Sequence, residues 1–176
     1  MTGAVLSPAE AAPIIVTALF GKADQAWFDA LRRAHFPPER NQLAAHLTMF
    51  HHLPPSAADE VSWRLKEEAR GVGAPRATLA APYSLGRGVA YRIHSPDLEA
   101  ARARIADAFT GLLTPQDQAG WRPHVTVQNK VAPGEAKALL AELSRGFVAR
   151  PVSIIGLAAW WYRGGPWEPL SRHLFR

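Results

Sequence analysis

The chain has 176 residues, of which 48% are hydrophobic and 20% charged, a balance typical of a globular protein with its own core. It contains no cysteine, which excludes disulfide frameworks, thiolate nucleophiles and cysteine-based zinc sites. The formal net charge of +5 favours an anionic partner such as a nucleotide or an RNA end, although a mildly basic surface explains it equally well.

The longest apolar run near the N-terminus, residues 13–20, is too short to span a bilayer. The first lysine, Lys22, follows this run, so the basic leader of a signal peptide is lacking. We therefore expect a cytoplasmic protein that contacts no membrane, and we expect it to be a monomer.

Hydrophobic periodicity predicts alternating strands and helices after a lead-in at residues 1–12. The elements expected in chain order are a strand at 14–20, a helix around 27–34, a strand at 44–50, a helix at 58–69, strands at 76–83 and 89–93, a helix from 96, a strand at 124–128, a helix from 133, and short strands at 152–157, 159–163 and 170–175. The buried positions expected on the helices are Trp27, Ala30, Leu31 and Ala34; Ala58, Val61, Leu65 and Ala69; Leu98, Ala101, Ile105, Ala108 and Leu112; and Ala136, Leu139, Leu140 and Leu143.

The strand–helix order occurs twice, and one short motif recurs with it. His46-Leu47-Thr48 and His124-Val125-Thr126 lie 78 residues apart, each in a predicted strand. At the same offset Pro55 corresponds to Pro133, Ala58 to Ala136, and Leu65 to Leu143. We interpret this as an internal duplication, with chance matches among common residues as the alternative. The predicted fold class is α+β: one two-lobed domain over residues 1–176, with antiparallel sheets lining a central cleft and helices outside.

The two HxT triplets form the strongest functional signal in the sequence. Side chains alternate along a strand, so the histidine and threonine of each triplet share one face. Two such strands facing one cleft would present two imidazoles and two hydroxyls to a phosphodiester. One neutral histidine would accept a proton, the other would donate one, and the threonines would hydrogen-bond the phosphate oxygens. The competing interpretation is two core histidines with threonines selected for β-propensity.

The segments HLTMF at 46–50 and RPHVTVQNK at 122–130 resemble the 2H phosphoesterase superfamily, and most closely its bacterial 2′-5′ RNA ligase-like branch. The resemblance spans nearly the whole chain. It implies that His46 and His124 are catalytic, that Thr48 and Thr126 bind phosphate, and that neither a metal nor a cofactor is required. The expected substrate is an RNA or nucleotide with a 2′,3′-cyclic or 2′-5′ phosphodiester. For hydrolysis we assign His124 as base and His46 as acid, roles that exchange in the ligation direction.

One departure from the family concerns the position five residues after the second histidine, where relatives often carry arginine. Here it is Asn129, followed by Lys130, which strand alternation would place on the face of His124 if the strand continued that far. Other candidates for substrate contact are Lys130, Arg122, His52, Tyr162 and Trp167. For each the alternative is an ordinary structural role, which we favour for His52 and for the two aromatic residues.

Two further hypotheses stay open at this level. The first is a nucleotide or RNA-end binding module whose histidines do not turn over a substrate. The second is a cyclic phosphodiesterase acting on a small molecule other than RNA. Substrate profiling would separate the second hypothesis from the RNA-directed enzyme.

Overall fold

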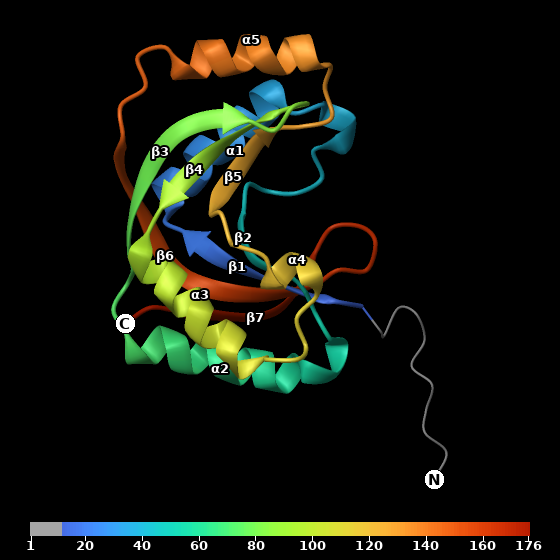
Figure 1. The fold of residues 1–176 in the computed structure, drawn as a ribbon, viewed down its shortest axis with the longest axis vertical. Helices are drawn as coiled ribbons and strands as arrows, with labels where there is room; N and C mark the ends of the chain where they lie inside the picture. Colours follow the sequence, from blue (N-terminus) through green and yellow to red (C-terminus); the bar gives the residue numbers. More distant parts are fainter. Residues whose placement is uncertain (1–11) are drawn as a thin grey trace.

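A computed structural model describes residues 12–176, and the first eleven residues of the predicted lead-in lie outside the described part (Figure 1). The elements are β1 (Ile14–Phe20), α1 (Lys22–His35), β2 (Leu47–Leu53), α2 (Ala58–Gly71), β3 (Arg76–Ser84), β4 (Val89–His94), α3 (Pro96–Ala108), α4 (Pro115–Gln118), β5 (His124–Gln128), α5 (Pro133–Ser144), β6 (Arg150–Trp161) and β7 (Glu168–Leu174), with short 3-10 turns at Pro38–Arg40 and Pro55–Ala57. None of the helices in this part of the chain is long and apolar enough to cross a membrane.

All the strands of the described residues join one antiparallel sheet, whose main path runs β2-β1-β6-β3-β4-β5, with β7 pairing β6. This order is the same from either end if β1 is exchanged with β4, β2 with β5, and β3 with β6. The last strand of each half therefore lies in the other half of the sheet: β3 pairs with β4, and β6 pairs with β1. The repeat predicted from the HxT offset is thus present in the strand order, and the predicted α+β class is confirmed.

The sheet curls so that its two end strands, β2 and β5, meet in the middle of the molecule (Figure 1). Helices α2 and α3 lie along one side, and α5 lies at the opposite end against β3 and β4. Helix α1 packs against β5, the strand that carries the second triplet. The fold therefore brings together the two strands on which the sequence places its HxT motifs.

Most element boundaries match the sequence prediction, and the largest differences concern strands. The expected strand at 44–50 begins only at Leu47, because the preceding residues form a loop that is bound to α1. In this loop the Ala45 N–H donates to Oδ1 of Asp29 at 2.7 Å. The two stretches expected at 152–157 and 159–163 form the single strand β6, which crosses from one half of the sheet to the other. Gly156 lies within this strand, and a Cβ there would overlap the His173 carbonyl oxygen of β7.

The face that α1 buries differs from the predicted one. Phe28 and Arg32 are the buried positions, whereas the expected Trp27 is 36% exposed. Arg32 is not among the expected buried positions, but its guanidinium makes hydrogen bonds inside the fold. Leu112, expected on the inner face of α3, lies beyond the end of that helix and is also exposed.

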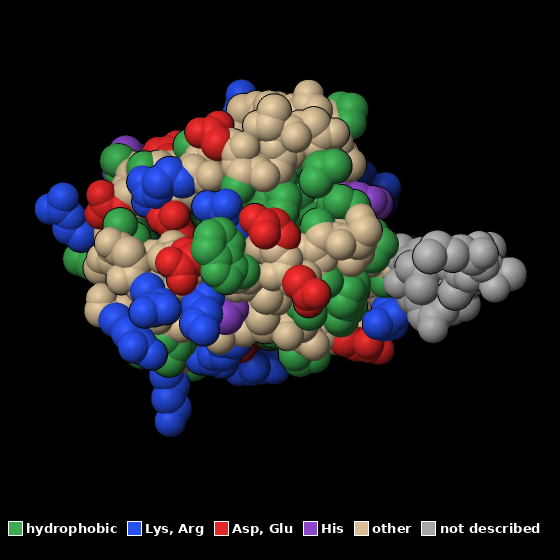
Figure 2. Space-filling view, turned by 90° about the horizontal axis from the view of Figure 1, so that it is seen from below, with side chains coloured by type: hydrophobic (Ala, Val, Ile, Leu, Met, Phe, Trp, Pro, Cys, Tyr) green, Lys and Arg blue, Asp and Glu red, His purple; other side chains and the backbone are tan. Residues whose placement is uncertain are grey.

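Charges on the α2 face of the molecule are mixed rather than segregated (Figure 2). Lysine and arginine side chains gather toward the side where the chain ends, with acidic side chains among them. Arg104 of α3 pairs with Glu68 of α2, and Arg70 pairs with Glu67 within α2. This face therefore has the character of an ordinary solvated surface, and the chemistry is to be found at the β2–β5 junction.

Candidate active site

Each of the two HxT histidines makes the same kind of local hydrogen bond, to the carbonyl two residues before it. Nδ1 of His46 lies 2.8 Å from the Ala44 carbonyl oxygen, and Nδ1 of His124 lies 2.7 Å from the Arg122 carbonyl oxygen. A carbonyl oxygen only accepts, so each Nδ1 carries the proton in the neutral ring and Nε2 carries the lone pair. Among residues 12–176 neither Nε2 has a hydrogen-bond partner. Each half of the molecule thus offers one oriented Nε2.

The two triplets lie close enough for their charges to interact. β2 and β5 are in contact, and a positive charge on His124 lowers the pKa of His46. Thr48 and Thr126 are partly exposed, whereas Leu47 and Val125 are buried, as strand alternation predicts. The structure therefore brings the strands of the two triplets into contact, with His46 and His124 close enough for their charges to interact.

The surroundings of His46 favour its neutral form. Burial is the main cause that lowers its pKa from 6.5 to about 4, and the nearby positive charges of Arg32, His124 and His51 lower it further. The bond to the Ala44 carbonyl opposes this shift without cancelling it. At neutral pH the free His46 is therefore an unprotonated imidazole, which is the state that a general base requires.

Each histidine also has an aromatic neighbour, but the two neighbours differ. The Trp167 ring lies 4.6 Å from the His46 ring, centroid to centroid, at an interplanar angle of 57°. Tyr83 presents its edge to His124 at 6.3 Å, and the guanidinium of Arg92 covers the Tyr83 ring at 4.7 Å. The aromatic contact is therefore closer on the His46 side.

A groove of about 520 Å³ extends from His46 along the sheet. Trp160 and Trp167 form an aromatic wall, and Lys22 and Arg172 contribute positive charge to its lining. The Trp160 indole N–H is held by the Thr17 hydroxyl at 2.9 Å, which fixes the orientation of that ring. The groove combines apolar surface with a few polar groups, as small-molecule sites commonly do.

Sequence reasoning missed Arg32, Arg102 and Asp117, all of which support the triplets from buried positions. Arg32 donates to the Thr126 carbonyl at 3.0 Å, and Arg102 donates to the Met49 carbonyl at 2.8 Å. The Asp117 carboxylate accepts the His51 and His52 backbone N–H groups and lies 3.2 Å from the His51 ring. Burial alone would raise the pKa of Asp117, but these hydrogen bonds from His51 and His52 lower it. One signal was available for the arginine of α1: Phe28 and Arg32 stand at helical i, i+4 spacing.

The predicted contact residues fall into two groups. Trp167 lies against His46, and Arg122 lies near Tyr83, on the side of His124. His52 and Tyr162 are exposed and make no side-chain hydrogen bond within residues 12–176. The alternation argument for His52 does not hold, because β2 has irregular pairing with β1 on both sides of Phe50, and it is the charge of His51 that acts on His46.

Lys130 does not lie on the face of His124 in the way the sequence suggested. β5 ends at Gln128, and Lys130 has a φ of 64°, so the alternation stops before it. Its exposed side chain instead lines an open hollow of about 530 Å³ with Arg40 and Gln42. Gln42 also lines the His46 groove, so the two hollows are neighbours.

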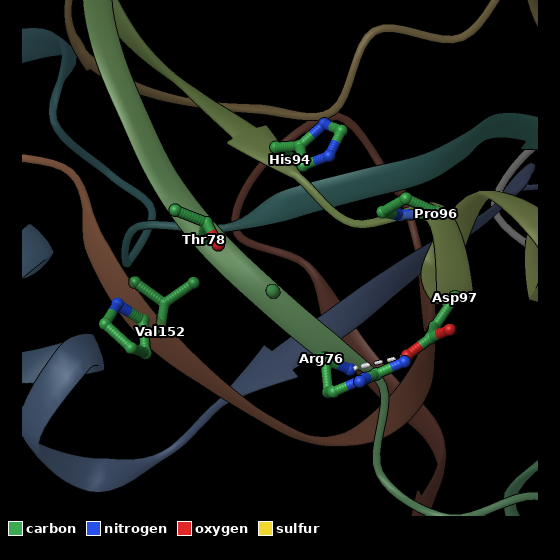
Figure 3. Close-up of a pocket in the computed structure, with 8 residues that line it drawn as sticks. Arg76, Thr78, His94, Pro96, Asp97 and Val152 are labelled. Carbon is green, nitrogen blue, oxygen red and sulfur yellow. Dashed lines mark hydrogen bonds and ion pairs between the residues drawn. The ribbon is translucent and has the colours of Figure 1, made fainter.

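A separate hollow of about 550 Å³ lies beside β3 and the start of α3 (Figure 3). Two of its lining residues are paired: the Arg76 backbone N–H donates to the Asp97 carboxylate at 3.0 Å, and the two side chains form an ion pair. The hollow contains neither triplet, and we assign no chemistry to it. In the described part of the chain, no three His, Asp or Glu side chains are grouped to hold a metal ion.

A curled antiparallel sheet that presents one HxT strand from each half defines the class of two-histidine, or 2H, phosphoesterases. The chain belongs to the 2′-5′ RNA ligase superfamily, whose family model matches residues 20–166. This match includes both triplets.

Solved structures share the fold over nearly the full length of both chains. A Thermus thermophilus protein, TT0787, is 15% identical with a TM-score of 0.60 and covers 93% of this chain and 98% of its own. E. coli LigT is 18% identical and covers 94% of this chain and 98% of its own, with TM-scores of 0.54 in complex with NADP+ and 0.52 in complex with 3′-AMP. No curated protein sequence matches the chain.

Proposed function

We propose that the protein is a phosphodiesterase that acts on 2′,3′-cyclic phosphates or 2′-5′ phosphodiesters of nucleotides or RNA, using His46 and His124 for both proton transfers and no metal. The observation that carries this proposal is the matched pair of Nδ1–carbonyl bonds, which leave two oriented Nε2 atoms on neighbouring strands. A phosphodiester reaction of this kind requires one base and one acid, and two imidazoles supply both.

In the hydrolytic direction Nε2 of His46 accepts a proton from water as its oxygen attacks phosphorus. The bond from phosphorus to one ribose oxygen then breaks, and protonated His124 donates its Nε2 proton to that oxygen. The lowered pKa of His46 favours this assignment over the reverse one that the sequence suggested, since burial keeps His46 unprotonated at neutral pH. In the ligation direction the two roles exchange.

The threonines complete the phosphate site in this proposal. The Thr48 and Thr126 side chains share the partly exposed faces of their strands with the histidines, so their hydroxyls are available to the non-bridging oxygens. Negative charge builds on those oxygens as the fifth bond to phosphorus forms, and hydroxyl donors stabilise it. Arg122, near Tyr83 and therefore on the His124 side, would add positive charge to the same site.

The groove beside His46 is proposed to hold the nucleoside. A base stacked on Trp167 would place its ribose next to the catalytic ring, since that ring lies 4.6 Å from His46. Lys130, His52 and Tyr162 would contact only longer substrates, because they lie outside this groove. LigT, which shares the fold, has been crystallised with 3′-AMP, NADP+ and ATP, so nucleotides are the first ligands to test.

The test is turnover of the four nucleoside 2′,3′-cyclic monophosphates, a 2′-5′ dinucleotide, and a short RNA ending in a cyclic phosphate, all with EDTA present. Phosphorus NMR identifies the product regioisomer. We expect one regioisomer, and a loss of about 10² or more in rate for His46→Ala and for His124→Ala. His94→Ala, an exposed histidine in the separate hollow on β3 and α3, is the matched control and should retain the wild-type rate.

Two outcomes would contradict the proposal. Turnover that survives both histidine variants would remove the two-histidine mechanism. Nucleotide binding without turnover in the wild type, retained in both variants, would indicate a binding module instead. Turnover restricted to cyclic phosphates outside RNA would keep the chemistry and replace the substrate class.

A further inference from the structure

Arg32 of α1 links the two triplets through one buried side chain. Its guanidinium donates through Nη1 to the Thr126 carbonyl oxygen at 3.0 Å and through Nε to the Asn41 side chain at 3.1 Å. Asn41 lies in the loop that leads into His46, whereas Thr126 belongs to the second triplet. The plane of the guanidinium is also covered by the Phe36 ring at 4.3 Å, and the residue is only 4% exposed.

Arg102 of α3 makes the equivalent connection in the opposite direction. It donates through Nε to the Met49 carbonyl, directly after the first triplet, and through Nη2 to the Asp117 carbonyl, both at 2.8 Å. Asp117 lies in α4, seven residues before His124, and Asn41 lies five residues before His46. A ring from β2, that of Phe50, covers this guanidinium at 4.5 Å.

The two connections follow the same symmetry as the strand order, since each arginine joins its own half of the chain to the other half. In each half, the first helix supplies an arginine that binds the segment before its own HxT histidine, a loop residue in the first half and α4 in the second, and the HxT strand of the other half. β2 and β5 end the main path of the sheet, and both arginines donate to carbonyl oxygens of these end strands. The backbone groups of an edge strand need such partners when they are buried.

Neither arginine forms an ion pair with any carboxylate of residues 12–176. Arginine is rarely buried without such a partner, because removing its charge from water is costly. Asp29 and Asp117 attract these charges from beyond ion-pair distance, but burial outweighs them and lowers the pKa of both arginines. Their positive charge is therefore only partly compensated, and a substrate phosphate bound between the triplets would supply further negative charge.

We propose that Arg32 and Arg102 are a pair of positioning residues that hold the two HxT strands at a catalytic separation. The proposal rests on the proposed function for its catalytic consequence. The two arginines also differ in one respect: the charge of Arg32 acts on His46, and that of Arg102 is not among the causes of the His46 pKa shift.

The structural part can be tested without any substrate. The chain contains no cysteine, so Lys66→Cys on α2 and Lys137→Cys on α5 give two exposed, specific spin-label sites on opposite halves. We expect a narrow distance distribution in the wild type and a broader or displaced one in Arg32→Met and Arg102→Met. Arg33→Met, an exposed neighbour on α1, is the matched control. Unchanged distributions in both test variants would overturn the proposal.

Arg→Lys variants separate the hydrogen-bonding fork from the charge, because lysine keeps the charge but cannot make both bonds with one planar group. With a cyclic nucleotide substrate, we expect kcat to fall at least tenfold in Arg32→Lys and Arg102→Lys, with KM changed less than about threefold. Histidine NMR titration should show the low pKa of His46 retained in Arg32→Lys and raised in Arg32→Met. Wild-type kcat in both lysine variants would contradict a positioning role. Absence of turnover in the wild type would instead count against the proposed function, and the distance measurement would still decide the arginine proposal.

Discussion

The His46 and His124 sides of the β2–β5 junction have the same backbone arrangement and different side-chain surroundings. Both rings bond the carbonyl two residues before them, at 2.8 and 2.7 Å. The nearest aromatic contact of His46 within residues 12–176 is Trp167 at 4.6 Å, whereas that of His124 is Tyr83 at 6.3 Å. Burial lowers the pKa of His46 to about 4. In the proposed mechanism the repeated backbone orients both imidazoles, and the burial of His46 selects it as the base.

The largest effect is expected from removing either of the two proposed catalytic histidines. His46→Ala and His124→Ala should each reduce the single-turnover rate about 10³-fold, and the double variant should be no slower than the worse single variant. Residues that act as a unit in one reaction lose most of its rate with the first removal. Rapid-quench measurements at saturating substrate would test this. Losses that multiply in the double variant would mean that the two halves act independently.

The lowered pKa of His46 predicts that the free energy of unfolding depends on pH. The unfolded chain protonates His46 near pH 6.5 and the folded protein only near pH 4, so folding excludes a proton between these values. Stability should therefore fall as the pH drops from about 6.5 to about 4, by up to about 3 kcal/mol from this residue.

His46→Gln should remove that contribution and make unfolding less sensitive to pH across the same window. Urea denaturation at several pH values, with the wild type alongside, measures the difference. An unchanged pH dependence in the variant would show that His46 is not held neutral, and the assignment of His46 as base would fail with it.

The features that the sequence predicts well are those carried by local pattern. β1 and β5 have the predicted bounds, because apolar β-branched runs between breakers are sufficient to define them. The paired triplets are found by their offset, and the strand order confirms the duplication that this offset suggests.

The positions of the supporting residues cannot be predicted from local pattern, because long-range contacts determine them. Asp117 stands in a polar stretch that predicts a loop, and its partners, the His51 and His52 N–H groups, belong to a strand in the other half. Arg32 is charged, so hydrophobic periodicity excludes it from a buried face that only tertiary hydrogen bonds make favourable. The loop that brings Trp167 onto His46 has no periodic pattern at all.

The threonines should be more nearly equivalent than the histidines. Thr48→Val and Thr126→Val keep the shape of the side chain and remove the hydroxyl, and each is expected to reduce kcat about 10²-fold, as loss of one transition-state hydrogen-bond donor commonly does. Steady-state kinetics with KM measured separately would test this. A loss confined to one variant would show that only one half holds the phosphate.

The smallest expected effect compares the two aromatic neighbours. Trp167→Leu should raise KM for a cyclic nucleotide about tenfold, because base–aromatic stacking contributes roughly 1–3 kcal/mol. It should also raise the pKa of His46, whose burial the indole provides in part. Tyr83→Leu is the matched variant on the other side, and we expect less than a threefold change in KM, since the Tyr83 face is already covered by the Arg92 guanidinium. Equal changes in both variants would indicate that the base contacts both aromatic rings, and a larger change in Tyr83→Leu would place the nucleoside on the His124 side.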